Sequence, residues 1–499
     1  MAYPGHPHPE ARPSRLAAIA ALLGFPAAPP ETCSVLELGA GDGAHLIPLA
    51  HEQPRARFVG MDLSAKAVER GQARIRELGL PNIRLEQGDI GSFEAAEPFD
   101  YVIAHGVYSW VPLDVQTALL ALCRRALAPH GLAYISYATY PGCHQREMVR
   151  NMMLFHTARL SGAEDVVKEG LRWARFVSQH QSHGEAYGRA IEHELERMER
   201  HALGYAFHDD FSEHNTPVYF GQMVESAREQ GLDFLAEALF MYFDDGRFSP
   251  EVMGMIEQLS GGDRITREQY LDFLRGRAFR QSLFCHAGQV PSGAWQLQKL
   301  RDLWVASSLA PQTPQTPAKE AGEVFVSPQG LELRIEQQFV RSAFRLLADV
   351  WPSALSVREL TERAALASAV SADDLPRAEQ LLLRTLLRAA AARLLELDVV
   401  PPPMAAGVSE RPLASPLARL EAQSSLLVTD LWHRRLQLED EASRFLLTAL
   451  DGQRDHAALA RIMAGFFKEH ATPSPDAADV ERQLELVLDG MRRRALLLA

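Results

Sequence analysis

Short apolar runs alternate with longer amphipathic stretches over residues 33–140 of the chain. The runs have the length and apolar content of buried strands, and the stretches between them have the length of helices. The predicted strands are 35–38, 58–61, 82–87, 99–104 and 131–137. Strands that alternate with helices indicate a doubly wound parallel α/β sheet, in which ligands bind outside the carboxyl ends of the strands.

The first predicted strand ends in an acid that is followed by three glycines at alternate positions. The acid is Glu37, and the glycines are Gly39, Gly41 and Gly43. Glycine permits a positive φ and lets the backbone approach a ligand closely, so the segment predicts a ligand-binding turn. A helix from about Ala44 would direct its N-terminus at that ligand, which favours an anionic group there.

Acidic residues also follow the next two strands. Asp62 comes about 20 residues after the first glycine, where an acid hydrogen-bonds ribose hydroxyls. Asp89 and Ile90 suit an adenine, the acid for its exocyclic amine and the aliphatic side chain for its ring face. The glycines are spaced G-x-G-x-G rather than G-x-G-x-x-G, and Glu37 would repel a pyrophosphate. These features predict S-adenosyl-L-methionine as the cofactor.

The residues expected at the cofactor lie at the ends of the first four strands. They are Glu37, Gly39, Gly41, Gly43, Asp62, Leu63, Asp89, Ile90 and His105. We expect no metal, since 208–215, with its two histidines and three acids, matches no zinc motif. This segment is expected to form a polar loop near the mouth of the acceptor site.

The order of strands, glycines and acids resembles the class I S-adenosylmethionine-dependent methyltransferases. Three segments narrow the resemblance to bacterial members with a methyltransferase regulatory domain, a group that includes the protein-lysine methyltransferases of rickettsiae. The segments are Ala104–Pro112, Thr139–Gly142 and Glu213–Asn215 with Pro217. The resemblance covers nearly the whole chain and is strongest over residues 1–300. It implies a Rossmann-like, seven-stranded methyltransferase core with helical inserts.

The resemblance also implies where a lid and the acceptor pocket lie. In similar proteins a Pro- and His-rich N-terminal arm folds over the cofactor, so Tyr3 and His6 are candidate lid residues. After the fifth strand, the family usually has an asparagine and a tryptophan where this chain has Ala138 and Cys143. Both positions fall at the expected acceptor pocket, so the two departures bear on which acceptor is used.

Aromatic residues after the fourth and fifth strands are candidates for the transfer step. The expected catalytic residues are His105, Tyr108, Tyr140 and His144. Methyl transfer is an in-line displacement, for which the protein supplies alignment, and aromatic faces stabilise the sulfonium and a cationic acceptor. A lysine, with an ordinary pKa of about 10.4, must lose a proton, and desolvation by aromatic rings favours that loss. His105 or His144 is a candidate base for an oxygen acceptor.

Composition and charge limit the other function classes. The chain has 499 residues, 47% hydrophobic and 23% charged, which is ordinary for a globular protein of several domains. The net charge of −13 disfavours a nucleic-acid substrate, and so does the absence of Asn-Pro-Pro-Tyr after the fourth strand. The four cysteines are far apart, which suits a reducing cytoplasm, and no apolar run predicts a membrane span. Leu16–Phe25 weakly mimics a signal peptide, but we interpret it as a helix that covers the sheet.

The catalytic core is expected to extend well beyond the fifth strand. We expect it to span residues 1–300, with a helical insert at about 145–215 and a regulatory segment at about 216–300. In that segment, a helix at 217–229 and strands at 232–243 and 278–285 are expected to complete the catalytic sheet, the last strand being antiparallel.

Pro-rich linkers at 309–322 and 399–416 precede two further predicted modules. The modules, 323–400 and 410–499, are expected to be small, winged-helix-like α+β units. The first is expected to hold strands around 328–330 and helices at 339–351 and 357–366. Neither has a basic recognition helix, which favours the positioning of a protein acceptor or self-association as a homodimer over DNA binding.

The sequence therefore predicts an S-adenosylmethionine-dependent methyltransferase that acts on a protein side-chain nitrogen, that of lysine. Two alternatives stay open. The first is a methyltransferase of a small molecule or a peptide natural product, whose C-terminal modules bind a carrier or leader peptide. The second is a non-catalytic binding protein that retains the methyltransferase fold.

Overall fold

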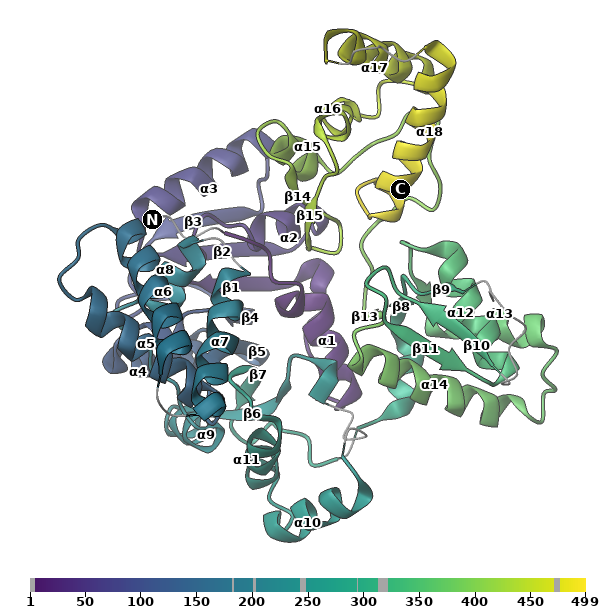
Figure 1. The fold of residues 1–499 in the computed structure, drawn as a ribbon. Helices are drawn as coiled ribbons and strands as arrows, with labels where there is room; N and C mark the ends of the chain where they lie inside the picture. The colour runs from purple at the N-terminus through teal and green to yellow at the C-terminus, as the bar shows by residue number, and fades with distance from the viewer. Residues whose placement is uncertain are drawn as a thin grey trace.

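The structure, a computed structural model, describes residues 5–181, 184–200, 203–242, 248–293, 295–312, 322–470 and 476–499. Figure 1 shows these residues as a large α/β core, a middle module drawn in green and a C-terminal module drawn in yellow-green to yellow. Helix α1 (Pro13–Leu22) lies between the core and the middle module.

A seven-stranded sheet forms the centre of the core, with the strand order β3-β2-β1-β4-β5-β7-β6. The strands are β1 (Ser34–Leu38), β2 (Arg57–Asp62), β3 (Ile83–Gln87), β4 (Phe99–Ala104), β5 (Leu127–Ala138), β6 (Leu232–Glu237) and β7 (Phe279–His286). Strands β1 to β5 pair in parallel, and β7 is antiparallel to both β5 and β6. This order confirms the predicted sheet, including its antiparallel last strand, and brings the carboxyl ends of β1, β2 and β4 to one edge.

Helices cover both faces of the sheet. They are α1, α2 (Leu46–Glu52) and α3 (Ala65–Leu78) on one face and α4 (Leu113–Ala126) and α9 (Phe220–Glu229) on the other. Successive residues of β1 point to opposite faces, so Val35 packs on the first set of helices and Leu36 on the second. Leu16 and Ile19 of α1 are fully buried, which confirms the interpretation of that apolar run as a covering helix.

The segment after β5 forms a helical insert with an apolar core of its own. Its helices are α5 (Cys143–Thr157), α6 (Ala163–His180), α7 (Gly184–Glu199) and α8 (Leu203–Asp210). The carboxylate of Asp210 is buried and accepts hydrogen bonds from Arg146 of α5 and Arg197 of α7. The expectation of a polar loop over 208–215 is therefore wrong at its start, because these ion pairs hold His208–Asp210 in the last turn of α8.

The regulatory segment completes the catalytic sheet, as predicted. Helix α9 begins at Phe220 rather than at 217, because Val218 pairs with Thr139 beyond the end of β5. Strand β6 ends at Glu237 rather than at 243, because the chain turns into a short 3-10 helix (Phe240–Tyr242). Helices α10 (Pro250–Ser260) and α11 (Arg264–Arg275) connect β6 to β7.

A buried ion network joins the regulatory segment to the sheet. Arg280 of β7 is fully buried, and its guanidinium donates to Glu237 of β6 at 2.6 Å and to Asp272 of α11 at 2.8 Å. The same guanidinium lies over the ring of Phe220 on α9, 3.7 Å from the ring centroid. One cation thus holds two strands and two helices together.

The middle module combines two small sheets with three helices. The elements are β8 (Trp304–Ala306), β9 (Ala310–Pro311), β10 (Glu323–Val326), β11 (Glu332–Ile335), α12 (Gln338–Val350), β12 (Leu355–Ser356), α13 (Val357–Ser368), α14 (Leu375–Ala391) and β13 (Glu396–Asp398). The hairpin of β10 and β11 and the helices α12 and α13 were predicted, whereas α14 was not. Strand β8 pairs with β12 and β13, so the module also draws on residues before the Pro-rich linker. The predicted linker at 309–322 is wrong at its start, because Ala310–Pro311 form β9 and pair with β10.

The C-terminal module consists of helices around a two-stranded hairpin. The elements are α15 (Pro416–Ala422), β14 (Leu427–Thr429), β15 (Arg435–Gln437), α16 (Glu441–Ala449), α17 (His456–His470) and α18 (Ala477–Arg493). The hairpin turn touches the catalytic core, where His433 Nε2 lies 2.9 Å from Glu52 Oε1 of α2. Within the described ranges, no helix combines the length and the apolar content that crossing a membrane requires.

Replacing Arg280 by alanine is expected to destabilise the core by about 3–5 kcal/mol, because Glu237 and Asp272 would stay buried with only the longer contacts of Arg277, at 3.7 and 3.3 Å. Thermal unfolding followed by circular dichroism measures the loss. Arg228→Ala, which removes a half-exposed ion pair with Asp233, is the matched control and is expected to cost less than about 1 kcal/mol. Equal losses in the two variants would contradict a structural role for the buried network.

Candidate functional site

The glycine turn after β1 has the backbone geometry that a close ligand contact needs. Gly39, Gly41 and Gly43 have φ angles of 75°, 56° and 73°. The amide of Gly39 donates to the carbonyl oxygen of Met61 at 2.8 Å, which fixes the turn against the end of β2. A Cβ atom at Gly39 would lie 2.5 Å from the side chain of Val107, whereas the space beside Gly41 is open. The turn therefore needs glycine, and its backbone stays accessible to a ligand.

Glu37 presents a buried carboxyl group beneath this turn. Its side chain is 3% exposed, and Oε2 has no hydrogen-bond partner within the described residues. Burial, followed by the neighbouring carboxylate of Asp62, raises the pKa of Glu37 to about 8. A buried carboxyl oxygen without a partner is costly unless a ligand supplies one. The cationic ammonium group of S-adenosylmethionine would be such a partner, so Glu37 fits the predicted cofactor.

Asp62 lies at the end of β2 and faces the same turn. Its Oδ2 accepts a hydrogen bond from the amide of Gly41, and its Oδ1 accepts one from the amide of Ser64, both at 2.8 Å. A carboxylate has about four acceptor positions, so two remain for ribose hydroxyls. These two backbone bonds orient the carboxylate before any ligand arrives.

Three more residues that were predicted at the cofactor follow β2 and β3. Leu63, for which no part of the cofactor was specified, is 70% exposed. Asp89 is also exposed, and its Oδ1 accepts from the amide of Gly91 in a local turn at 2.7 Å. Ile90 is partly buried against the core. Their contacts with the cofactor stay a prediction.

His105 follows β4 at this edge and is held on several sides. Its Nδ1 lies 2.9 Å from the hydroxyl of Tyr134 on β5, and its ring stacks on that of His8 with 3.5 Å between the centroids. Burial lowers the pKa of His105 to about 4, although the nearby carboxylate of Glu10 acts in the opposite direction. His105 is therefore neutral near pH 7 and brings no charge to the site.

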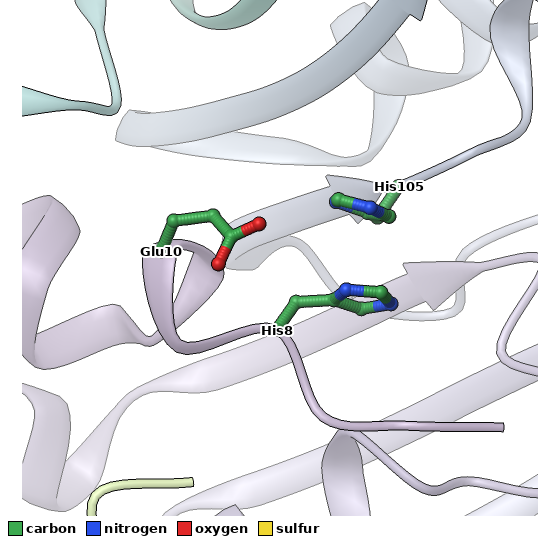
Figure 2. A group of neighbouring side chains, drawn as sticks. All are labelled: His8, Glu10 and His105. Carbon is green, nitrogen blue, oxygen red and sulfur yellow. The ribbon is translucent and has the colours of Figure 1, made fainter. Parts of the chain in front are cut away.

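Figure 2 shows how His8 and Glu10 of the N-terminal arm meet His105. Ligand atoms of the three side chains lie within 4.8 Å of one another, a spacing at which a metal ion has to be considered. A histidine binds a metal through a lone pair in the plane of its ring. The His8 and His105 rings are stacked with only 19° between their planes, so their lone pairs do not converge on one ion. The geometry fits a neutral stacked pair beside a carboxylate better than it fits a metal centre.

Tyr140 and His144 form a second aromatic group at the start of α5. Their rings stack with 4.2 Å between the centroids, and the ring of Tyr219 lies 5.1 Å from that of Tyr140. The hydroxyl of Tyr140 donates to Glu147 at 2.8 Å. The sequence predicted Tyr140 and His144 together but missed Tyr219, which lies just ahead of α9. The ring contacts of His105 lead instead to His8, Tyr134 and Phe279.

Three residues that were expected at the acceptor are buried instead. Tyr108 is 3% exposed, and its ring packs on Tyr137 in the core beneath α4 and α9. Ala138 and Cys143 are also buried, and the Cys143 thiol donates to the carbonyl oxygen of Ala278. All three side chains therefore pack inside the protein. A contact of Tyr108 with the acceptor stays a prediction, as does the effect of Ala138 and Cys143 on the choice of acceptor.

The N-terminal arm, residues 5–12, crosses the ligand edge of the sheet. A Cβ atom at Gly5 would lie 2.4 Å from Oδ1 of Asp42, so the arm passes directly over the glycine turn. Further along the arm, the amide of His8 donates to Nδ1 of His45, and Oε1 of Glu10 accepts from the Gln281 amide at 2.6 Å.

The arm thus has the position of a lid, as the resemblance implied. His6 contacts the hydroxyl of Tyr205 on α8, whereas Tyr3 lies outside the described residues. Sequence reasoning missed His8 and Glu10, for which the Pro- and His-rich composition of the arm was the only signal.

The middle module and the C-terminal module both hold the arm. Arg12 donates two hydrogen bonds, at 2.8 and 2.7 Å, to the carboxylate of Asp398 at the end of β13, and both side chains are almost fully buried. In the next turn, Arg15 pairs with Glu396 at 3.0 Å. At the other end of the arm, Arg435 of the C-terminal module donates to the carbonyl oxygen of Gly5 at 2.8 Å. The arm is therefore fixed on both sides of the site.

Family models match three parts of the chain. Residues 35–131 match a methyltransferase domain, residues 203–286 match a predicted methyltransferase regulatory domain, and residues 410–496 match the C-terminal winged-helix domain of PKMT. The regulatory match ends at β7, so the matched segment supplies the last two strands of the catalytic sheet.

Relatives and solved structures agree with these matches. An uncharacterized protein of Rickettsia prowazekii is 34% identical over 57% of this chain and 51% of its own length. A second one is 31% identical over 47% of this chain and 94% of its own length. The chain thus spans about half of the first relative and nearly all of the second. The structure of PKMT2 from Rickettsia typhi in complex with AdoHcy covers 100% of both chains at a TM-score of 0.88 and 22% identity, and so shares the fold.

Replacing Asp62 by alanine is expected to weaken the binding of S-adenosylmethionine by about 1–3 kcal/mol, because the ribose would lose hydrogen bonds to a charged acceptor. Isothermal titration calorimetry measures the affinity. Asp233→Ala removes a carboxylate on β6, far along the sheet from β2, and serves as the control. An unchanged affinity in Asp62→Ala would overturn the assignment of the ribose site.

The raised pKa of Glu37 predicts a proton release when the cofactor binds. Below about pH 8 the carboxyl group is protonated in the free protein, and a bound cation favours its ionised form, so affinity is expected to rise with pH and to level off above about 8. The rise approaches about tenfold per pH unit, as for one coupled proton. Calorimetry at pH 7 in two buffers of different ionisation heat counts the proton. Glu37→Gln is expected to release none, and an equal release from this variant would contradict the assignment.

Proposed function

The chain belongs to the class I S-adenosylmethionine-dependent methyltransferases that carry a methyltransferase regulatory domain, and from that premise we propose that it methylates lysine side chains of proteins. The cofactor and the reaction class follow from the family. The identity of the acceptor is the new part of the proposal, and it is argued from the residues around His105.

The observation that carries the proposal is the combination of ring faces and one carboxylate at the end of β4. His8, Tyr134 and Phe279 surround His105, and Glu10 lies beside it. Ring faces and a carboxylate both favour a cationic acceptor, whereas a carboxylic acid substrate would be repelled. Among the acceptors that methyltransferases use, a primary amine fits this environment best.

The similar proteins support the same acceptor. The solved structure with the matching fold is described as PKMT2, and the winged-helix family that matches residues 410–496 is described as that of PKMT. Both descriptions point to protein lysine methyltransferases, and the fold match covers the whole chain, including the middle and C-terminal modules. We further propose that the partner of this chain is a protein that presents the lysine. A homodimer and a cytoplasmic location stay predictions.

When bound, S-adenosylmethionine supplies a methyl carbon that its sulfonium group activates. Glu37 would hold the ammonium group of the cofactor's methionine part and Asp62 its ribose, which would fix the methyl carbon relative to the end of β4. The stacked rings of His8 and His105 exclude water from that end and, being neutral, add no positive charge beside a sulfonium. The surrounding rings lower the pKa of an incoming ammonium by desolvation, and the remaining catalytic effect comes from alignment.

The proposal is tested by incubating the full chain with methyl-labelled S-adenosylmethionine and lysine-rich bacterial proteins. Mass spectrometry of the products is expected to place the label on lysine Nζ atoms. Matched peptides in which the lysine is acetylated are expected to stay unlabelled. Label found only on small molecules or on leader peptides would support the first alternative, and cofactor binding without any transfer would support the second.

A variant at the end of β4 links this activity to the site. His105→Ala is expected to lower kcat by up to about 100-fold, because it removes the ring that places the acceptor against the methyl carbon. Labelled-methyl transfer at saturating cofactor measures kcat, and His193→Ala, an exposed histidine of the helical insert, is the control. If His105→Ala and His193→Ala kept equal activity, the acceptor site would lie elsewhere.

A further inference from the structure

A cavity of about 420 Å³ lies where the core, the N-terminal arm and the middle module meet. Glu10 and Arg15 line it from the arm side, Phe279 and Gln281 from β7, and Arg393 and Glu396 from the middle module. Its volume falls within the range of roughly 300–1,000 Å³ that is typical of ligand sites. None of the motifs that predicted the cofactor site lies in it.

Two residues that line this cavity, Glu10 and Phe279, lie close to His105 at the end of β4. The ring of Phe279 lies 6.2 Å from the ring of His105, edge to face. The carboxylate of Glu10 and the ring nitrogens of His8 and His105 lie within 4.8 Å of one another. Phe279 and Glu10, which both line the cavity, are thus neighbours of His105.

The charges along the cavity wall differ in how they are matched. Glu396 is paired with Arg15 at 3.0 Å, so these two charges offset each other. Arg393, which donates to the sulfur of Met241, adds a cation on the side of the cavity that the middle module lines. Glu10 receives its hydrogen bond from the uncharged amide of Gln281. The hydrogen bond from Gln281 therefore orients the carboxylate of Glu10 without neutralising its negative charge, which stays available to a cation in the cavity.

We propose that this cavity is the port for the acceptor lysine and that Glu10 binds its ammonium group beside His105. The inference rests on the proposed function and adds to it the residue that recognises the substrate. The acceptor class is a lysine in an extended or mobile segment of a protein, because a side chain has to pass between the arm and the middle module to reach Glu10.

Methyl transfer needs a neutral amine, so the bound ammonium first gives up one proton to water in the cavity, which opens to solvent. The lone pair so freed forms the new N–C bond, while the C–S bond breaks and its electrons stay on the sulfur of the departing S-adenosylhomocysteine. The product is a methylated ammonium, and no other co-reactant is needed.

The middle module fixes the geometry of this port. The ion pair between Arg12 and Asp398 fixes the chain, two residues after Glu10, to the end of β13. Ser14 adds two hydrogen bonds to the backbone of Val400, at 2.8 and 3.1 Å. In Figure 1, α1 lies between the core and the middle module, where these contacts form one wall of the port. The module thus contributes one side of the port and also positions the arm that carries Glu10.

The test compares Glu10→Gln with the full-length parent chain and with Glu31→Gln, a matched change outside the cavity. With a lysine peptide as substrate, Glu10→Gln is expected to raise KM by about tenfold or more, the effect of losing one hydrogen bond to a charged group. The Kd for S-adenosylmethionine is expected to change by less than about twofold, since Glu10 is outside the cofactor contacts. Glu31→Gln is expected to change neither value.

A binding measurement makes the test independent of turnover. By fluorescence anisotropy, the parent chain is expected to bind a lysine peptide more tightly than the same peptide with norleucine, and Glu10→Gln is expected to lose that difference. Leu239→Trp, which fills the cavity without changing its charge, is expected to weaken both peptides. Unchanged KM and unchanged discrimination in Glu10→Gln would overturn the inference. A parent chain that methylates no lysine at all would overturn the proposed function instead.

Discussion

The ion pair between Arg12 and Asp398 joins the N-terminal arm to the middle module inside the protein. Both side chains are almost completely buried, so the loss of either would leave the charge of the other buried without a partner. Arg12 ends the arm and leads into α1, so the pair decides where the arm crosses the sheet. The lid over the glycine turn, the stack of His8 on His105 and the wall that carries Glu10 all depend on that one position.

The regulatory segment has a structural role that its description does not suggest. Its strands β6 and β7 lie at one end of the catalytic sheet, and β7 covers the edge that β5 would otherwise expose. The buried network around Arg280 ties those strands to α9 and α11. A segment held in this way is part of the core, so any influence that it has on catalysis passes through contacts within the core, such as those of Gln281 with Glu10 and of Phe279 with His105.

The parts of the fold that sequence could predict are those whose cause is local. Apolar runs set the five parallel strands, and the residues at their ends, such as Glu37 and Asp62, were placed by the strands themselves. The polar segment at 208–215 was misjudged because Asp210 is buried by arginines from two other helices. Glu10 was missed because its partner is also distant in the sequence. Its partner Gln281 is 271 residues away, and Asp398 is 386 residues from Arg12, so no local pattern could reveal either contact.

The arm also sets the order in which the molecule is completed during synthesis. Its residues are made before those of the sheet, and its partners in the two later modules, from Glu396 to Arg435, are made after the last strand of the sheet. Domains generally form as the chain emerges, so the sheet and the core residues that contact the arm, such as His45 and Gln281, are made before those later partners. The newly made enzyme therefore passes through a stage in which its core is formed but the arm still lacks its ion pairs with the middle module.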